Sequence, residues 1–412
     1  MDHLAEILLQ LFVLLLAAKI GDEIFKRLGQ PTVVGEILAG VVVGPALLGW
    51  YEINAETQLF AEIGVVLLLF QVGVETRLGD LLKVGGTAAA VGGLGVVVPL
   101  AGGFALGSLL GYSIEVSVFL AAALVATSVG ITSGVLGSLG ALRTMSGRVI
   151  LGAAVIDDVL AMLILAVATG LAGGGVSVDR ILTLVALAVA FIGIVVIGGT
   201  QVLRRRRSLL TDPEFASTPF LPGMIIMLGL AALSAIIGLA AIIGAFLAGM
   251  VVGESSERHA LEEEVAPVAA FFTPFFFGSI GAQVDLAGLA DWGVIALLLG
   301  VTAVAIVTKF AGALVGSLRL GMRRATLIAA GMVPRGEVGI VVAGLGLQTG
   351  AISGSVYSVV VGMAILTTLI VPPFLPALVR RAEADAEPPP EAGGPPAGTE
   401  DDGGLPPEAR GA

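Results

Sequence analysis

The stretch Gly35-Glu-Ile-Leu-Ala-Gly-Val-Val-Val-Gly44 decides the fold, because a close copy, Gly244-Ala-Phe-Leu-Ala-Gly-Met-Val-Val-Gly253, follows 209 residues later. Seven of the ten positions are identical. The same offset aligns Val129-Gly-Ile with Val338-Gly-Ile. Patterns of small residues also recur in membrane bundles that have no repeat. Two matches at one offset nevertheless favour an internal repeat.

The chain around these copies is too apolar for a soluble protein. Of its 412 residues, 57% are hydrophobic and 13% are charged, and the mean hydropathy is +1.03. Soluble domains are about 45–50% apolar and about 25% charged. The composition therefore predicts an all-α polytopic membrane protein, surrounded by lipids and without a nucleic-acid partner.

Cofactor chemistry has little support in the sequence. There is no cysteine, and the only histidines are His3 and His259. This excludes disulfides, iron–sulfur clusters and thiolate sites, and two histidines cannot build a His-rich metal site. The motifs of intramembrane enzymes are not convincingly placed either. We therefore expect a transporter that needs no cofactor, and not an enzyme.

A membrane helix needs about 20 mainly apolar residues, and the sequence contains thirteen such segments. The least certain division lies around Gly238, where no polar loop separates two of them. The thirteen predicted spans cover residues 4–25, 31–49, 59–76, 84–111, 116–137, 147–172, 180–203, 219–237, 239–253, 266–283, 292–318, 325–347 and 355–379.

The positive charges predict how these spans are oriented. Sixteen Lys and Arg residues lie in one set of alternate connections, and only Arg180 lies in the other. Cytoplasmic connections carry such an excess. We therefore expect the N-terminus outside and the C-terminus in the cytoplasm. The bias holds only if 219–253 forms two spans.

The offset of 209 maps the second span onto the ninth and the fifth onto the twelfth. Each pair is an odd number of spans apart, so the two copies run in opposite directions. The sequence thus predicts two inverted-topology repeats joined by a linker helix at 180–203. Secondary transporters are often built in this way, with the substrate site between the repeats.

Ionisable groups inside a membrane are costly and mark functional sites. Asp157 and Asp158 lie roughly 15 Å deep in the sixth span, at 1.5 Å per residue. They point about 100° apart, so one can enter a water-filled cavity while the other meets a cation. Lys309 lies at a similar depth, roughly 14 Å, in the eleventh span. The alternative is that Lys309 and one aspartate form a purely structural ion pair.

Two spans are predicted to be broken. The fifth contains Thr127, Ser128 and Gly130, and the twelfth contains Pro334-Arg-Gly-Glu337. Proline removes a backbone donor and clashes with the preceding turn. Interrupted segments at matching repeat positions point to a transporter's binding site. We expect Arg335 and Glu337 to neutralise the exposed helix ends, with direct ion contact by Glu337 as the weaker alternative. Residues 382–412 are acidic and rich in Pro and Gly, which predicts a disordered cytoplasmic tail.

These motifs resemble the monovalent cation:proton antiporter-2 family, most closely the NapA-type bacterial sodium/proton antiporters. The resemblance covers residues 1 to about 380. It is carried by Gln30-Pro-Thr-Val-Val-Gly-Glu, Leu69-Phe-Gln-Val-Gly-Val-Glu-Thr, Ala126-Thr-Ser-Val-Gly-Ile-Thr, Ile156-Asp-Asp-Val and Pro334-Arg-Gly-Glu.

The resemblance implies a homodimer in a bacterial inner membrane, with two discontinuous helices that cross near the ion site. A core (about 84–172 and 292–379) would move like an elevator against a scaffold (about 4–76 and 219–283). Asp158 would bind the transported sodium ion or a proton, and Asp157 would pair with Lys309. Thr127 and Ser128 would add oxygen ligands.

The leading hypothesis is therefore an electrogenic sodium (or lithium)/proton antiporter with about two protons per sodium, which would serve pH and sodium homeostasis. Potassium/proton exchange on the same scaffold is the first alternative, because the sequence does not give the size of the site. Sodium-coupled symport of an organic solute is the second. That function would need a solute cavity and would not need Asp157 and Lys309 as a pair.

Overall fold

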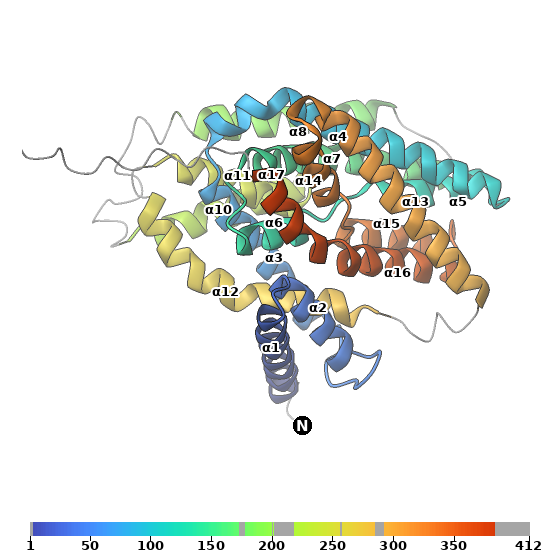
Figure 1. Ribbon diagram of the computed structural model, residues 1–412, viewed down its shortest axis with the longest axis horizontal. Coiled ribbons are helices and arrows are strands. Elements are labelled where there is room, and N and C mark those ends of the chain that lie inside the picture. Colours follow the sequence, from blue (N-terminus) through green and yellow to red (C-terminus); the bar gives the residue numbers. More distant parts are fainter. Residues whose placement is uncertain are drawn as a thin grey trace, which may run out of the picture.

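A computed structural model describes residues 3–172, 178–199, 201, 218–255, 258–284 and 292–383 (Figure 1). Within these ranges every regular element is a helix. Eight helical segments of the described chain are long and apolar enough to cross a membrane, and one of them comprises both Ile114–Val125 and Val129–Ser138. The expected all-helical membrane class is therefore confirmed, whereas the count of thirteen spans stays a prediction. Most of the acidic tail, residues 384–412, lies outside the described ranges.

One set of helices, the scaffold group, comes from two distant parts of the chain. Here α1 packs against α2, α2 and α3 both pack against α12, and α11 packs against α3 and α10. In Figure 1, α1 and α2 occupy the bottom of the view, with α12 beside them. The group consists of α1 (His3–Arg27), α2 (Thr32–Val43), α3 (Ala55–Glu75), α10 (Phe220–Ile236), α11 (Ala241–Gly253) and α12 (Arg258–Ala282).

A second set of helices forms the core group, in which α4 packs against α5, α7 and α13, and α13 also packs against α14 and α16. In Figure 1, α5, α13, α15 and α16 lie on the right. The group consists of α4 (Leu78–Leu109), α5 (Ile114–Val125), α6 (Val129–Ser138), α7 (Met145–Ala172), α13 (Trp292–Ser317), α14 (Met322–Gly331), α15 (Glu337–Gln348) and α16 (Gly354–Ile370).

A connecting helix and several short elements complete the described part of the chain. Helix α8 (Val178–Gly193) continues into a π-helical segment, η1 (Ile194–Gly199). Because α8 contacts α7 and η1 contacts α11, this connector touches both groups. The 3₁₀ turns η4 (Leu318–Leu320) and η5 (Pro372–Phe374) precede α14 and α17 (Leu375–Glu383), and α17 packs against α14.

The two sequence copies make equivalent packing contacts. A Cβ atom on Gly35 would lie 2.2 Å from the carbonyl oxygen of Gly21, and one on Gly244 would lie 2.1 Å from that of Leu230. Gly21 and Leu230 are themselves 209 residues apart. Only glycine allows the helix pairs α1–α2 and α10–α11 to approach so closely. The repeated motif therefore specifies the same helix contact twice, while the inverted direction of the second copy stays a prediction.

The division of 219–253 at Gly238 is confirmed. Helix α10 ends at Ile236 and α11 begins at Ala241. Gly238 has a φ of +89°, a backbone angle that residues other than glycine rarely adopt. The Ser234 hydroxyl donates a hydrogen bond to the Ala240 carbonyl across the turn. A single glycine thus reverses the chain where the sequence offers no polar loop.

Both predicted helix interruptions occur in the structure. Helices α5 and α6 are separated at residues 126–128, and α14 and α15 at residues 332–336. Pro334 cannot donate a backbone hydrogen bond within a helix, and Gly336 has the non-helical backbone angles φ −151° and ψ −142°. Each break leaves the carbonyl oxygens of one half-helix and the amides of the next without helical partners. The candidate site is built around these groups.

Candidate functional site

Two aspartates on α7 form the acidic part of the site. The side chain of Asp157 is completely buried, and Asp158 is only 3% exposed. Leu151, Ala153 and Ala154, earlier on the same helix, are buried in the main apolar core. The adjacent carboxylates therefore lie deep inside the protein, where an uncompensated charge is costly.

Lys309 on α13 compensates Asp157. Its Nζ atom lies 2.5 Å from Asp157 Oδ1, and neither side chain has exposed surface. The same Nζ donates to the carbonyl oxygen of Val125 at 2.8 Å. Val125 is the last residue of α5, so Lys309 joins α13, α7 and the broken end of α5. The structure thus brings together the lysine and the aspartate that were expected to pair.

Arg335 neutralises the same broken helix end. Its guanidinium is completely buried and donates to the carbonyl oxygens of Val125 at 2.8 Å and Ala126 at 2.7 Å. A longer contact of 3.4 Å reaches the Ala305 carbonyl on α13. The C-terminal end of a helix carries partial negative charge and favours cations. Two cations, Lys309 and Arg335, therefore meet at the end of α5.

Two threonines on α16 hold the backbone of Arg335. The Arg335 amide donates to Thr367 Oγ1 at 3.1 Å, and Thr368 Oγ1 donates to the Arg335 carbonyl at 2.7 Å. Both threonines are fully buried. Sequence reasoning missed this pair. The repeat offset could have pointed to it, because adding 209 to the position of Asp158 gives Thr367.

The two broken helices cross at their interruptions. The Ser128 amide donates to the Pro334 carbonyl at 2.9 Å. The Thr127 hydroxyl donates to the Met332 carbonyl at 3.3 Å, and the Thr132 hydroxyl to the Gly331 carbonyl at 2.7 Å. Hydroxyls thus cap the end of α14, whereas cations cap the end of α5. Glu337 begins α15, but its side chain lies outside the described residues.

Asp158 lines a small cavity between the two helix groups. The cavity has a volume of about 10 Å³, close to the smallest space that holds one water molecule. Among the described residues of its lining, Asp158 is the only charged one. The other lining residues are Leu69, Val129, Leu151, Val155, Ile242, Ile243 and Phe246, from α3, α6, α7 and α11. A carboxylate here can hold one small cation or one proton at the boundary of the scaffold and core groups.

Comparisons with known proteins agree on a family of transporters. Residues 11–381 match the transmembrane family described as sodium/hydrogen exchanger. The chain is 38% identical to the Na⁺/H⁺-K⁺ antiporter GerN of Bacillus cereus, over 90% of this chain and 95% of that protein. It is 33% identical to the high-affinity Na⁺/H⁺ antiporter NhaS3 of Synechocystis, over 93% of this chain and 92% of that protein.

The fold is similar to a solved antiporter structure. The sodium proton antiporter MjNhaP1 of Methanocaldococcus jannaschii superimposes with a TM-score of 0.64, over 92% of this chain and 97% of that chain. The two sequences are 16% identical. At this identity the match concerns the arrangement of the helices alone.

Proposed function

We infer that this chain, which belongs to the sodium/hydrogen exchanger family, exchanges sodium or lithium ions for protons across a bacterial inner membrane. The observation that carries this proposal is the placement of Asp158. Asp158 is buried and lines a cavity at the boundary of the two helix groups, together with Val129, the first residue after the break between α5 and α6.

Competition at Asp158 provides the exchange mechanism. A carboxylate with one small cavity beside it holds a sodium ion or a proton, and the two cannot occupy it together. Thr127 and Ser128, at the break of α5 and α6, would supply neutral oxygen ligands, since the Thr127 oxygen remains able to accept while its proton is donated to Met332. Exchange follows if the loaded site crosses the membrane and the empty charged site does not.

Lys309 is proposed to carry a second proton. Burial favours the neutral form of a lysine, and the adjacent Asp157 favours the charged form. A sodium ion at Asp158 adds positive charge nearby, so the ion pair breaks and Lys309 loses its proton. Two protons would then exchange for one sodium ion. A membrane voltage would drive this exchange by roughly 2.3 kcal/mol per charge per 100 mV.

We also propose that the core group moves as an elevator against the scaffold group. The walls of the Asp158 cavity support this division, because Leu69, Ile242 and Phe246 belong to scaffold helices whereas Val129 and Leu151 belong to core helices. Sliding at this boundary would move Asp158 from one side of the membrane to the other. The scaffold would form a homodimer, with the N-terminus outside and the C-terminus in the cytoplasm.

Potassium is the alternative cation, and one observation favours it. The name of GerN, the relative with 38% identity, includes K⁺ together with Na⁺ and H⁺. Potassium/proton exchange would use the same carboxylate and the same competition. The two candidates differ only in which ion drives protons out of the site.

The proposal is tested with purified protein in liposomes that contain a pH-sensitive dye. We expect sodium or lithium to drive proton movement in wild-type vesicles and potassium to drive less. Asp158→Asn should remove the response while the protein remains folded, as judged by its elution as a single species in gel filtration. Wild-type exchange by Asp158→Asn would contradict the assignment, and a stronger response to potassium would favour the alternative cation.

A further inference from the structure

An ion pair joins the core group to the scaffold group away from the cation site. Arg143 lies in the connection between α6 and α7, two core helices, and Glu262 lies on the scaffold helix α12. The Arg143 guanidinium donates a hydrogen bond to Glu262 Oε1 at 3.1 Å. Neither residue lines the Asp158 cavity. The pair therefore acts on the relative position of the two groups and not on the bound ion.

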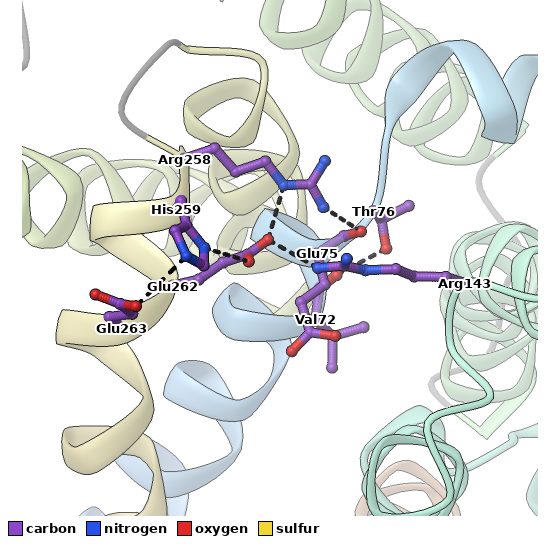
Figure 2. A network of polar contacts seen from close by, with 8 residues as sticks. All are labelled: Val72, Glu75, Thr76, Arg143, Arg258, His259, Glu262 and Glu263. Carbon is purple, nitrogen blue, oxygen red and sulfur yellow. Dashed lines mark hydrogen bonds and ion pairs between the residues drawn. The ribbon is translucent and has the colours of Figure 1, made fainter. Parts of the chain in front are cut away.

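The scaffold end of this pair is fixed. Arg258 Nε donates to the same oxygen of Glu262 at 2.7 Å, and the Arg258 guanidinium also donates to the Glu75 carbonyl, at the end of α3, at 2.5 Å (Figure 2). The Thr76 hydroxyl donates to another carbonyl of that helix end at 2.7 Å. The side chains of Arg258 and Glu262 are only 16% and 20% exposed. Glu262 thus keeps a cationic partner and its position whether or not the core group contacts it.

The core end of the pair is anchored through its backbone. Ala141 and Leu142, next to Arg143, are buried. The Thr144 hydroxyl donates to the Ala141 carbonyl at 2.8 Å and accepts from the Gly147 amide, in the first turn of α7, at 3.1 Å. The backbone of Arg143 must therefore move together with α7, while its side chain is 59% exposed.

The covalent link between the two groups lies beside the pair. Only Thr76 and Arg77 separate the scaffold helix α3 from the core helix α4. Both have extended backbone angles, with φ −96° and ψ 121° at Thr76 and φ −84° and ψ 128° at Arg77. A short extended link holds neighbouring helices together without fixing their relative position. Non-covalent contacts such as the Arg143–Glu262 pair must then select one position of the core group.

We propose that the Arg143–Glu262 pair is a latch that holds the core group in the position described here and opens whenever the core group slides. Opening this pair strands no charge, because Glu262 retains Arg258 and the Arg143 side chain is exposed. Arg143 and Arg258 also line a polar cavity of about 120 Å³, which has space for several water molecules. A fully buried pair would resist such opening, since separated charges would lose their partners inside the protein.

The latch is expected to be weak. Ion pairs with an exposed partner contribute little to stability, so loss of this one should shift the ratio of two core positions about twofold to fivefold. Arginines in these connections also fit a role in membrane topology, but that role requires positive charge and no bond to Glu262. The latch rests on the proposed sliding of the core group, so the experiment measures that movement separately from ion exchange.

The test uses the distance between one spin label on each group. The chain contains no cysteine, so single cysteines at Leu28, which follows α1, and Met322, which begins α14, label the scaffold and the core. Both positions are exposed. Pulsed electron paramagnetic resonance on the purified full chain in lipid nanodiscs then gives the populations of the core positions.

We expect two distances in the labelled chain, and a twofold to fivefold shift away from the described position in Arg143→Gln. Arg143→Lys keeps the charge and should retain most of the population. His259→Gln is the matched control, because His259 approaches the other oxygen of Glu262, at 3.9 Å, from the same helix, and its loss should change nothing. Added choline chloride should screen the exposed pair and shift the unsubstituted chain but not Arg143→Gln.

Each contrary result has its own meaning. Equal populations in the unsubstituted chain and in Arg143→Gln would overturn the latch, and a single distance in every variant would overturn it together with the proposed sliding. In liposomes, Arg143→Gln should raise the maximal rate of sodium-driven proton movement about twofold. An unchanged rate with shifted populations would overturn opening of the latch as a step of transport. If the unsubstituted chain moved no protons with sodium, the proposed ion exchange would fail, while the distances would still decide the latch.

Discussion

Lys309 and Arg335 donate hydrogen bonds to the same acceptor, the carbonyl oxygen of Val125, each at 2.8 Å. Lys309 lies on α13 and Arg335 in the break between α14 and α15, and the two side chains meet at the last residue of α5. Arg335 keeps its charge under all physiological conditions. If Lys309 loses a proton during transport, Arg335 still neutralises the end of α5. The arrangement therefore allows Lys309 to lose its proton while the carbonyl oxygens at the end of α5 keep a positively charged partner.

Lys309→Gln separates a proton-carrying lysine from a structural one. If Lys309 carries the second proton, the surviving exchange moves one proton per sodium ion and becomes insensitive to voltage. This is checked in liposomes in which a potassium gradient and valinomycin set the voltage. Wild-type voltage dependence in Lys309→Gln would show that the Lys309–Asp157 pair is structural and that the second proton is carried elsewhere.

Arg335→Leu should destabilise the fold more than any exposed arginine substitution. The change removes hydrogen bonds to the Val125 and Ala126 carbonyls in a fully buried site. Bonds to a charged donor contribute about 1.5–3 kcal/mol each, so we expect a loss of at least about 3 kcal/mol. Thermal unfolding in detergent measures it, with Arg319→Leu as the exposed control. Equal melting temperatures for the two variants would contradict this role.

Thr367→Val tests whether the α16 hydroxyl positions Arg335. Valine has a similar shape but leaves the Arg335 amide without its acceptor, at a cost of about 1–3 kcal/mol. Thr367→Ser retains the hydroxyl and should keep most of the stability. A displaced Arg335 should also lower the maximal exchange rate, and serine should rescue that rate. If valine and serine behave alike in both measurements, the hydroxyl has no positioning role.

Thr127→Val should weaken apparent sodium affinity more than the maximal rate, because a neutral oxygen contributes to coordination and carries no proton. We expect the sodium concentration at half-maximal exchange to rise about twofold to tenfold, which corresponds to the loss of one hydrogen-bond-like contact with a neutral oxygen. Sodium titration of exchange in liposomes gives both parameters, and Thr127→Ser serves as the control that keeps the oxygen. A lower rate with unchanged half-saturation would assign Thr127 to the crossing of the helices alone.

Much of the fold can be predicted because its signals are local. Pro334 marks the second interruption, and Gly238 marks a division for which the charge pattern gives independent support. The internal repeat could also be detected in the sequence. Its motif is retained in both copies because the close helix contacts of Gly35 and Gly244 tolerate only glycine. Depth along each helix placed Lys309 level with the aspartates. The choice of Asp157 over Asp158 as its partner came from the family resemblance.

Two features of the structure depend on long-range packing that no nearby sequence pattern indicates. Thr367 also donates to the Ala364 carbonyl on its own helix, as a hydroxyl in any apolar helix can do. Nothing in its sequence neighbourhood reveals the second contact with Arg335. The arginines that line the cavity where α3 ends and α7 and α12 begin come from three connections, and the sequence shows their charge but not their convergence. Long-range contacts decide both cases.

Proton release on sodium binding tests the central claim most directly. The purified protein in detergent is titrated with sodium in a calorimeter, in buffers of different ionisation enthalpy and at two pH values. The account predicts release of between one and two protons per bound sodium, weaker apparent affinity at the lower pH, and no sodium binding by Asp158→Asn. Sodium binding without proton release, and with equal affinity at both pH values, would contradict competition at Asp158.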